Sequence, residues 1–235
     1  MISQTIYNNQ KSTADYITLN NLKNQGYKYI FLAVGKEESA TLSIKGSNLK
    51  YVYSANDFLR LSDTKTQELL SNKDACIIGG GNVAIDSARK AKRFCQTSRI
   101  IYRRKRENMP ANNSEIKEAE NENVEFQFQK NVVEVEELSN DEKNIILTLD
   151  DGTKIKTDFL IEAIGSKIKE SYFDDEIKIE ENRISVDENF ETNLKNIFAG
   201  GDLVNKSQTV ANTIKTGFEV AKNIKERIAK TNLST

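Results

Sequence analysis

Short apolar runs that end in glycine recur along the chain, and polar or charged stretches separate them. Residues 27–35, 75–79, 159–165 and 196–202 share this design. Continuous apolar runs of this length are typical of strands that are buried on both faces of a parallel sheet. The pattern predicts an α/β protein built on parallel strands.

Helical patterns fill much of the polar sequence between these runs. The expected helices cover residues 19–24, 55–61, 83–94 and 115–123, and a long amphipathic helix near the C-terminus carries Val210, Ile214, Gly217, Ala221, Ile224 and Ile228 at helical spacing. Residues 61–74 are polar, and we expect them to cross between two domains.

A group of shorter runs follows the fourth expected helix. Residues 124–128, 133–135, 145–149 and 154–161 read as strands, the first two by their alternation of apolar and polar positions. Asp-Gly at 151–152 lies between the last two runs and is a strong hairpin signal. We expect these strands to be antiparallel and to form an insertion that packs on the parallel sheet.

A glycine turn, residues 79–84 (Gly-Gly-Gly-Asn-Val-Ala), joins an apolar strand to a helix. Gly79 allows a tight turn, Gly81 allows a pyrophosphate to approach the backbone, and Ala84 lets the helix pack closely on the strand. The N–H groups at the helix start then hold the phosphates. Because a second strand follows at 100–102, the order of elements favours nucleotide binding over a merely structural turn.

Two arginines, Arg103 and Arg104, stand at the end of that second strand, where NAD-binding proteins place an acidic ribose reader. Arginine suits the 2′-phosphate of NADPH instead. One hydrogen bond to a charged group is worth roughly 1.5–3 kcal/mol, so a single contact favours NADPH by about tenfold or more. A solvated basic loop is the alternative, because Lys105 and Arg106 continue the run. We favour a functional role for at least one arginine, without choosing between them.

Two polar residues near the C-terminal end are weaker candidates. Asp202 follows a buried strand and two glycines, where a carboxylate can accept a hydrogen bond from a ligand hydroxyl. A turn or N-cap aspartate explains the same spacing. Thr209 opens the last helix, whose N–H groups could point at an electron-rich ring.

Composition narrows the chemistry. The chain has 235 residues, a net charge of -1, no histidine, and two cysteines without Cys-x-x-Cys spacing. The charge gives no basic field to recruit nucleic acid, and no apolar stretch reaches membrane-spanning length, so we expect a cytoplasmic protein. No catalytic or metal-ligating side chain is assigned, and any redox chemistry must belong to a bound cofactor.

The motifs taken together resemble one family. The chain is similar to the NADPH-binding region of the glutamate synthase small subunit, and to the flavin and NADPH domains of dihydropyrimidine dehydrogenase, at residues 79–89, 102–104, 107–111, 33–35, 163–165 and 198–202. The resemblance covers nearly the whole chain. It implies that NADPH gives a hydride to FAD and that electrons leave singly through iron–sulfur clusters.

The resemblance also implies roles for individual residues. The NADPH pyrophosphate would lie against Gly79, Gly81, Asn82, Val83 and Ala84, its 2′-phosphate against Arg103 and Arg104, and Gly165 would lie near the cofactor. The FAD ribityl and pyrophosphate would contact Gly201 and Asp202, and the flavin ring would contact Thr209 and Val210.

The expected fold is a Rossmann-like three-layer NADPH-binding domain with an antiparallel insertion, itself inserted into a partial FAD-binding domain. The expected boundaries are 1–73 for the first FAD part with the crossing segment, 74–165 for the NADPH domain, and 166–235 for the second FAD part. The family's earlier dinucleotide-binding turn and its cysteine-bearing helical domain have no counterpart here. We therefore expect a missing N-terminal segment or a partner subunit with iron–sulfur clusters, such as a glutamate synthase large subunit.

Two other functions stay open. One is a non-catalytic NADPH-binding fragment, or half of a split flavoprotein. The other is a thioredoxin-reductase-like disulfide reductase, which the lack of paired cysteines disfavours.

Overall fold

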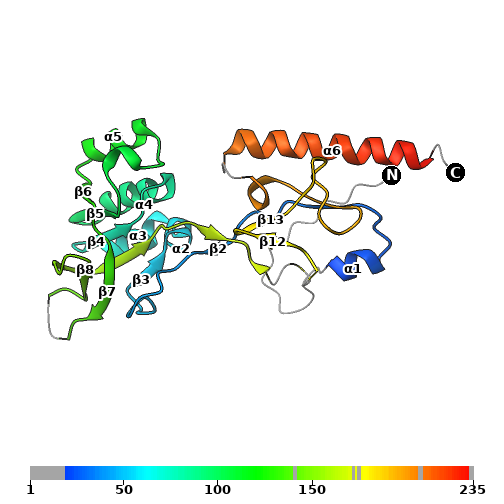
Figure 1. The fold of residues 1–235 in the computed structure, drawn as a ribbon. Helices are drawn as coiled ribbons and strands as arrows, with labels where there is room; N and C mark the ends of the chain where they lie inside the picture. The colour runs from blue at the N-terminus through cyan, green and yellow to red at the C-terminus, as the bar shows by residue number, and fades with distance from the viewer. Residues whose placement is uncertain (1–18, 140–141, 171–172, 174–175, 206–208, 233–235) are drawn as a thin grey trace. The chain divides into compact units, whose positions relative to one another are not determined.

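The structure is a computed structural model that describes residues 19–139, 142–170, 173, 176–205 and 209–232. The chain forms two compact units. Unit 1 contains residues 1–37 and 168–235, and unit 2 contains residues 38–167 (Figure 1). Unit 2 is thus inserted into unit 1 in sequence. The α/β class is confirmed.

A five-stranded parallel sheet forms the centre of unit 2. Its strands are, in spatial order, β3 (Val52–Ser54), β10 (Phe159–Glu162), β4 (Asp74–Ile78), β5 (Thr97–Tyr102) and β6 (Glu125–Phe128). The central strand β4 has four consecutive buried residues, which explains the unbroken apolar run in its sequence.

Helices cover one face of this sheet. They are α2 (Ala55–Arg60), α3 (Asp63–Leu70), α4 (Asn82–Lys92) and α5 (Asn113–Asn121). Alternate strand residues such as Ile77, Ile100 and Ile161 share a core with Ile85 of α4 and Ile116 of α5. Side chains alternate across a strand, so these residues face the helices and their neighbours face the opposite side.

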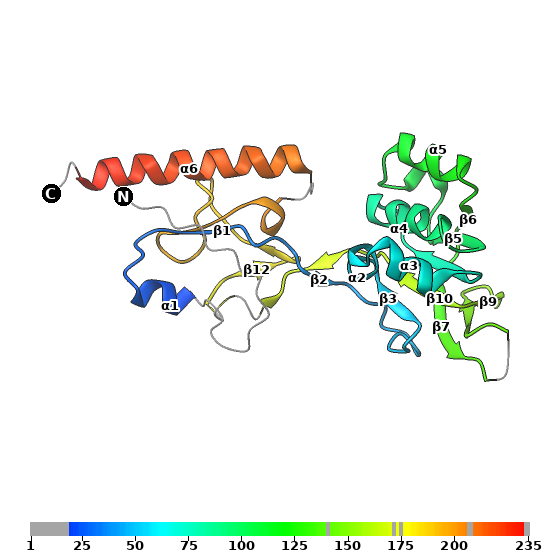
Figure 2. The ribbon, with the colours of Figure 1, turned by 180° about the vertical axis from the view of Figure 1, so that it is seen from behind.

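A three-stranded antiparallel sheet covers the other face. It consists of β7 (Val132–Glu137), β8 (Ile145–Leu149) and β9 (Lys154–Thr157), with β8 in the middle. Ile78, Ile101 and Leu160 of the parallel sheet share a second core with Leu147 and Ile155 of the antiparallel one. Figures 1 and 2 show α4 and α5 on one side of the parallel sheet and β7 on the other. The expected three layers are confirmed.

Two strands assigned to the insertion join the parallel sheet instead. Residues 125–128 pair in parallel with β5, and the run 154–161 divides into β9 and β10, which lie in different sheets. The break falls at Asp158, whose buried carboxylate accepts a hydrogen bond from the Asp74 N–H (2.8 Å) and pairs with Lys143 (3.0 Å). The alternation of apolar and polar residues shows which face of a strand is buried, but it does not show which strand lies beside it. The sequence therefore did not determine to which sheet residues 125–128 and 159–162 belong.

The expected crossing segment at 61–74 is mostly helix α3. Ser62 caps its N-terminus by accepting from the Lys65 N–H, and Leu70 is fully buried in the unit 2 core. The boundaries between the two units fall at 37/38 and 167/168, where β2 (Glu38–Ser39) pairs with β11 (Ser166–Lys167). The expected boundaries were at 73/74 and 165/166. Residues 38–73 therefore belong with the sheet of residues 74–162.

Unit 1 is built around a pair of parallel strands. Its elements are α1 (Leu19–Asn24), β1 (Ile30–Leu32), β12 (Ile179–Glu180), β13 (Arg183–Ile184), β14 (Ile197–Ala199), the 3-10 turn η3 (Gly201–Leu203) and α6 (Val210–Asn232). Strands β1 and β14 pair in register from Ile30–Ile197 to Leu32–Ala199. Helix α6, orange to red in Figure 2, runs alongside these strands.

The apolar positions of α6 do not all face the core. Val210, Ile214 and Phe218 are 77%, 54% and 74% exposed, whereas Thr216 and Val220 are buried. The first half of the helix therefore presents an apolar stripe to solvent. No helix in the described part of the chain combines the length and the hydropathy that a bilayer crossing needs.

Candidate functional site

The glycine turn lies at the carboxyl end of β4, the central strand of unit 2. Gly79 has a φ of +142°, and a Cβ there would lie 2.2 Å from the Ala163 carbonyl oxygen. Ala84 is fully buried against this turn. The local roles expected for Gly79 and Ala84, a tight turn and close packing, agree with this geometry.

Gly81 differs from Gly79 because open space surrounds it. It is the N-cap of α4 with φ -87°, and a Cβ there would meet nothing within 4 Å. Asn82 and Val83 form the first turn of α4, where a helix has no internal acceptor for its N–H groups. Val83 is 42% exposed. Here the backbone can be approached and the helix dipole favours an anion.

A strap, residues 103–112, leaves β5 and returns to the glycine turn. The Ala111 N–H donates to the Gly80 carbonyl oxygen (3.2 Å), and the Asn112 N–H donates to Asn82 Oδ1 (2.9 Å). The basic run at the start of the strap therefore lies on a loop that is hydrogen-bonded to the turn. Sequence spacing alone did not predict this closure.

The structure distinguishes among the basic residues of the strap. Arg106 forms a bidentate pair with Glu120, with both N···O distances at 2.9 Å. Arg103 and Arg104 are exposed, and neither makes an ion pair within the part of the chain that the structure describes. A guanidinium without a carboxylate partner is available to a ligand phosphate, so this geometry favours Arg103 and Arg104 over Arg106.

Two residues at this edge are not among the expected site residues. Tyr102 is 8% exposed, and its ring covers Gly80. Glu162, at the end of β10, is buried, and burial raises the pKa of its carboxyl group. Its Oε1 accepts a hydrogen bond from the Leu42 N–H (3.0 Å), which opposes part of this rise. Gly165 follows with φ +114° and accepts from the Ala40 N–H (2.9 Å).

The expected FAD-contacting residues gather at the corresponding edge of unit 1. Gly201 has φ +63°, and Asp202 Oδ1 accepts from Thr213 Oγ1 of α6 (3.5 Å). Thr209 Oγ1 accepts from the Asn212 N–H (3.3 Å), so its side chain caps α6. Val210 is the exposed first residue of that helix.

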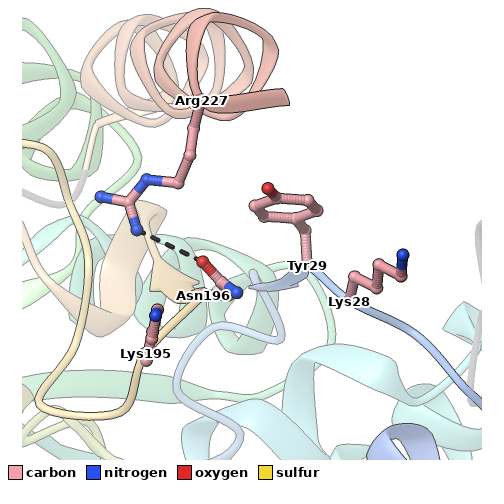
Figure 3. Close-up of a pocket in the computed structure, with 5 residues that line it drawn as sticks. All are labelled: Lys28, Tyr29, Lys195, Asn196 and Arg227. Carbon is pink, nitrogen blue, oxygen red and sulfur yellow. Dashed lines mark hydrogen bonds between the residues drawn. The ribbon is translucent and has the colours of Figure 1, made fainter. Parts of the chain in front are cut away.

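A pocket of about 460 Å³ lies at the opposite, amino end of β1 and β14. Figure 3 shows Arg227 reaching from α6 to Asn196, with Lys28, Tyr29 and Lys195 around them. Arg227 Nη1 bonds Glu191 (2.5 Å) and Asn196 Oδ1 (3.4 Å). These contacts anchor α6 to the start of β14, on the far side from Gly201.

Both cysteines are unsuited to thiol chemistry. Cys76 lies inside β4 and Cys95 follows α4, and neither forms a disulfide. Burial raises the pKa of each thiol to about 11, so both are protonated near neutral pH. The structure gives no support to the disulfide reductase alternative.

Residues 3–217 match the pyridine nucleotide-disulphide oxidoreductase family. The β subunit of the NADP(+)-dependent formate dehydrogenase of Moorella thermoacetica is 30% identical over 231 residues, covering 88% of this chain and 32% of that protein. The glutamate synthase [NADPH] small chain of Azospirillum brasilense is 28% identical over 232 residues, covering 83% and 48%.

A solved structure agrees in fold. Thioredoxin reductase from T. acidophilum matches with a TM-score of 0.69 at 21% identity, covering 86% of this chain and 66% of that one. The chain spans about a third and a half of the lengths of the two curated relatives above. Strand order, glycine turn and family match lead to one conclusion: the chain belongs to the pyridine nucleotide-disulphide oxidoreductase family.

Proposed function

We propose that the chain is the NADPH- and FAD-dependent part of an electron-transfer oxidoreductase of the glutamate synthase small-subunit type. The observation that carries the proposal is the glycine turn of unit 2 with two unpaired arginines on a strap bonded to it. Gly79, Gly81, Asn82, Val83 and Ala84 then hold the pyrophosphate, with Gly165 nearby. Arg103 and Arg104 hold the 2′-phosphate.

Unit 1 contributes part of an FAD site in this proposal. Gly201 and Asp202 contact the ribityl and pyrophosphate, and Thr209 and Val210 lie against the flavin ring. The Asp202–Thr213 hydrogen bond supports it, because it joins the turn at Gly201 and Asp202 to the start of α6, which Thr209 caps. With both cofactors bound, NADPH would supply a hydride to FAD, which with one proton gives FADH2 and NADP+, and the two electrons would then pass singly to iron–sulfur centres or a partner subunit.

The names of relatives support the same cofactor and the same setting. The formate dehydrogenase subunit is NADP(+)-dependent, and the glutamate synthase small chain carries NADPH in its name. Both names describe one subunit or chain of a larger enzyme. We therefore propose a partner that carries the acceptor centre, such as a glutamate synthase large subunit or an iron–sulfur segment.

Cofactor affinity tests the proposal directly. The double variant Arg103→Leu/Arg104→Leu should weaken NADPH binding at least about tenfold, while NADH binding changes by less than about twofold. Titration calorimetry measures both constants. Arg106→Leu is the matched control, because Arg106 is already paired with Glu120, and it should leave both affinities nearly unchanged.

Two outcomes would contradict the proposal. Equal losses for NADPH and NADH would show that the arginines do not read the phosphate. A wild-type chain that binds neither NADPH nor FAD, even with its native partner, would reject the function as a whole.

A non-catalytic NADPH-binding role is the second candidate, and the small parallel sheet of unit 1 favours it. Among the described residues, the glycine-rich strand end of unit 1 lies on two parallel strands, whereas that of unit 2 lies on five. Absorbance from 300 to 600 nm, before and after NADPH, separates the two candidates. A flavin band that bleaches supports the oxidoreductase, and a colourless protein that still binds NADPH supports the second role.

A further inference from the structure

Tyr102 connects the sheet, the glycine turn and the strap. It is the last residue of β5, and a Cβ on Gly80 would lie 2.4 Å from Cε2 of its ring. Its hydroxyl donates to the Asn108 carbonyl oxygen in the middle of the strap (2.7 Å). One side chain thus lies on the phosphate-binding backbone and bonds the loop that carries the arginines.

The strap is held at both ends as well. At its start, the Gln129 N–H donates to the Arg104 carbonyl oxygen (3.1 Å), and the Lys130 N–H donates to that of Tyr102 (3.2 Å). At its end, Ala111 is 7% exposed in the main core, next to the bond between Asn112 and Asn82. The backbone between these anchors has little freedom to change its distance from the turn.

The Arg104 carbonyl oxygen is one of these anchors, and Arg103 lies between it and the anchored Tyr102 carbonyl oxygen. The side chains of both arginines are exposed and, among the described residues, unpaired, so only the strap backbone determines where they reach. A long cationic side chain loses rotamer entropy when it binds, and that cost is smaller if its backbone is already fixed. Fixing the strap therefore strengthens a contact to a 2′-phosphate and leaves the pyrophosphate contacts unchanged.

We infer that Tyr102 is a positioning residue for cofactor specificity, and that the Asn82–Asn112 bond assists it. The inference rests on the proposed NADPH site. In this arrangement Tyr102 sets the distance between the glycine turn and the two arginines without touching the cofactor. Asn82 uses its side-chain oxygen for the strap, which leaves its backbone N–H for the phosphates.

Tyr102→Phe tests the inference because it removes only the hydroxyl and keeps the ring on Gly80. NADPH affinity should fall about three- to tenfold, whereas NADH affinity should stay within about twofold. Tyr53→Phe is the control, since Tyr53 is half-buried against the same core and its hydroxyl makes no hydrogen bond within the described residues. It should leave both affinities unchanged.

A second variant removes the other anchor. Asn112→Pro deletes the N–H that donates to Asn82, and the φ of -62° at this position suits proline. It should shift the ratio of NADPH to NADH affinity in the same direction as Tyr102→Phe. Unlike a substitution of Asn82, it leaves the proposed phosphate contacts in place.

Trypsin provides a readout that does not depend on cofactor. The basic run 103–106 contains four cleavage sites. If the anchors restrain the strap, trypsin without nucleotide should cut within 103–106 several times faster in Tyr102→Phe and Asn112→Pro than in wild type or Tyr53→Phe. Mass spectrometry of the fragments locates the cut.

The outcomes separate this inference from the proposed function. Wild-type specificity and cleavage rates in both variants would overturn the inference and leave the NADPH site standing. Equal losses of NADPH and NADH affinity would also overturn it, because Tyr102 would then act on the turn itself. If the wild-type chain binds NADPH no more tightly than NADH, both the proposed NADPH specificity and this inference are wrong.

Discussion

Each unit has a strand that ends in glycines beside a helix, but the aromatic ring that packs on these glycines is buried in unit 2 and partly exposed in unit 1. In unit 2, Gly80 lies under the Tyr102 ring, which is 8% exposed and bonded to the strap. In unit 1, Gly200 lies under the Phe31 ring, which is 39% exposed. The neighbouring helix in unit 1 presents Phe218 and other apolar residues to solvent.

The difference shows that a glycine turn beside a helix becomes an enclosed site only when other segments close over it. In unit 2 the strap is hydrogen-bonded to the turn, and the turn lies at the end of the central strand of a five-stranded parallel sheet. In the described residues of unit 1, the same kind of turn lies on a two-stranded parallel pair. We therefore expect substitutions at the turn of unit 2 to cost more than those in unit 1.

Gly79→Ala should have the largest effect. The substitution combines a φ of +142° with a Cβ placed 2.2 Å from the Ala163 carbonyl oxygen, so unit 2 should lose at least about 2 kcal/mol of stability. Gly81→Ala is the control. Its Cβ meets open space, so stability should change by less than about 0.5 kcal/mol while NADPH binding weakens. Urea unfolding measures the stabilities, and equal values for the two variants would contradict the enclosed turn.

Gly200→Ala should cost less, about 1 kcal/mol. The new Cβ would lie 2.9 Å from the Phe31 ring and 3.0 Å from Thr216 Cγ2, and the backbone is already extended. Because Phe31 is partly exposed, its ring can move aside. Hydrogen exchange should show the loss within unit 1 alone. A cost as large as that of Gly79→Ala would remove the contrast between the units.

Glu162→Gln should stabilise unit 2 by a smaller, pH-dependent amount. Burial raises the pKa of this carboxyl group above its unfolded value, so the folded state binds the proton more tightly. Wild-type stability then falls as pH rises from the ordinary glutamate pKa through the raised one. The variant lacks this loss and keeps an acceptor for the Leu42 N–H. Its advantage should therefore grow from pH 4 to 7, and an advantage independent of pH would exclude this cause.

Phe218→Ser should have the smallest effect, below about 0.5 kcal/mol, because the side chain is 74% exposed. Val220→Ala, at a fully buried position on the same helix, should cost about 2 kcal/mol. Urea unfolding of both variants compares the two faces of α6. A loss above 1 kcal/mol for Phe218→Ser would mean that another part of the protein packs on this face of α6 in solution.

Sequence by itself determined the local elements. The apolar runs, the glycine turn and the Asp-Gly hairpin predicted β4, α4, β5 and the β8–β9 pairing, and the helical spacing predicted α6. These features depend on residues a few positions apart, so local propensity and periodicity are enough to specify them. The same local signals predicted the glycine turn and its basic neighbours as a nucleotide site.

Only the tertiary structure decided how distant segments meet. It paired Arg106 with Glu120 and left Arg103 and Arg104 free of ion pairs among the described residues. In the structure the Tyr102 ring also packs on Gly80, and residues 38–73 pack with unit 2. Part of the apolar face of α6 is exposed to solvent. The physical reason is that these contacts depend on how whole layers of secondary structure pack together. A local sequence pattern shows which residues are apolar, but it does not show which distant segment will bury them.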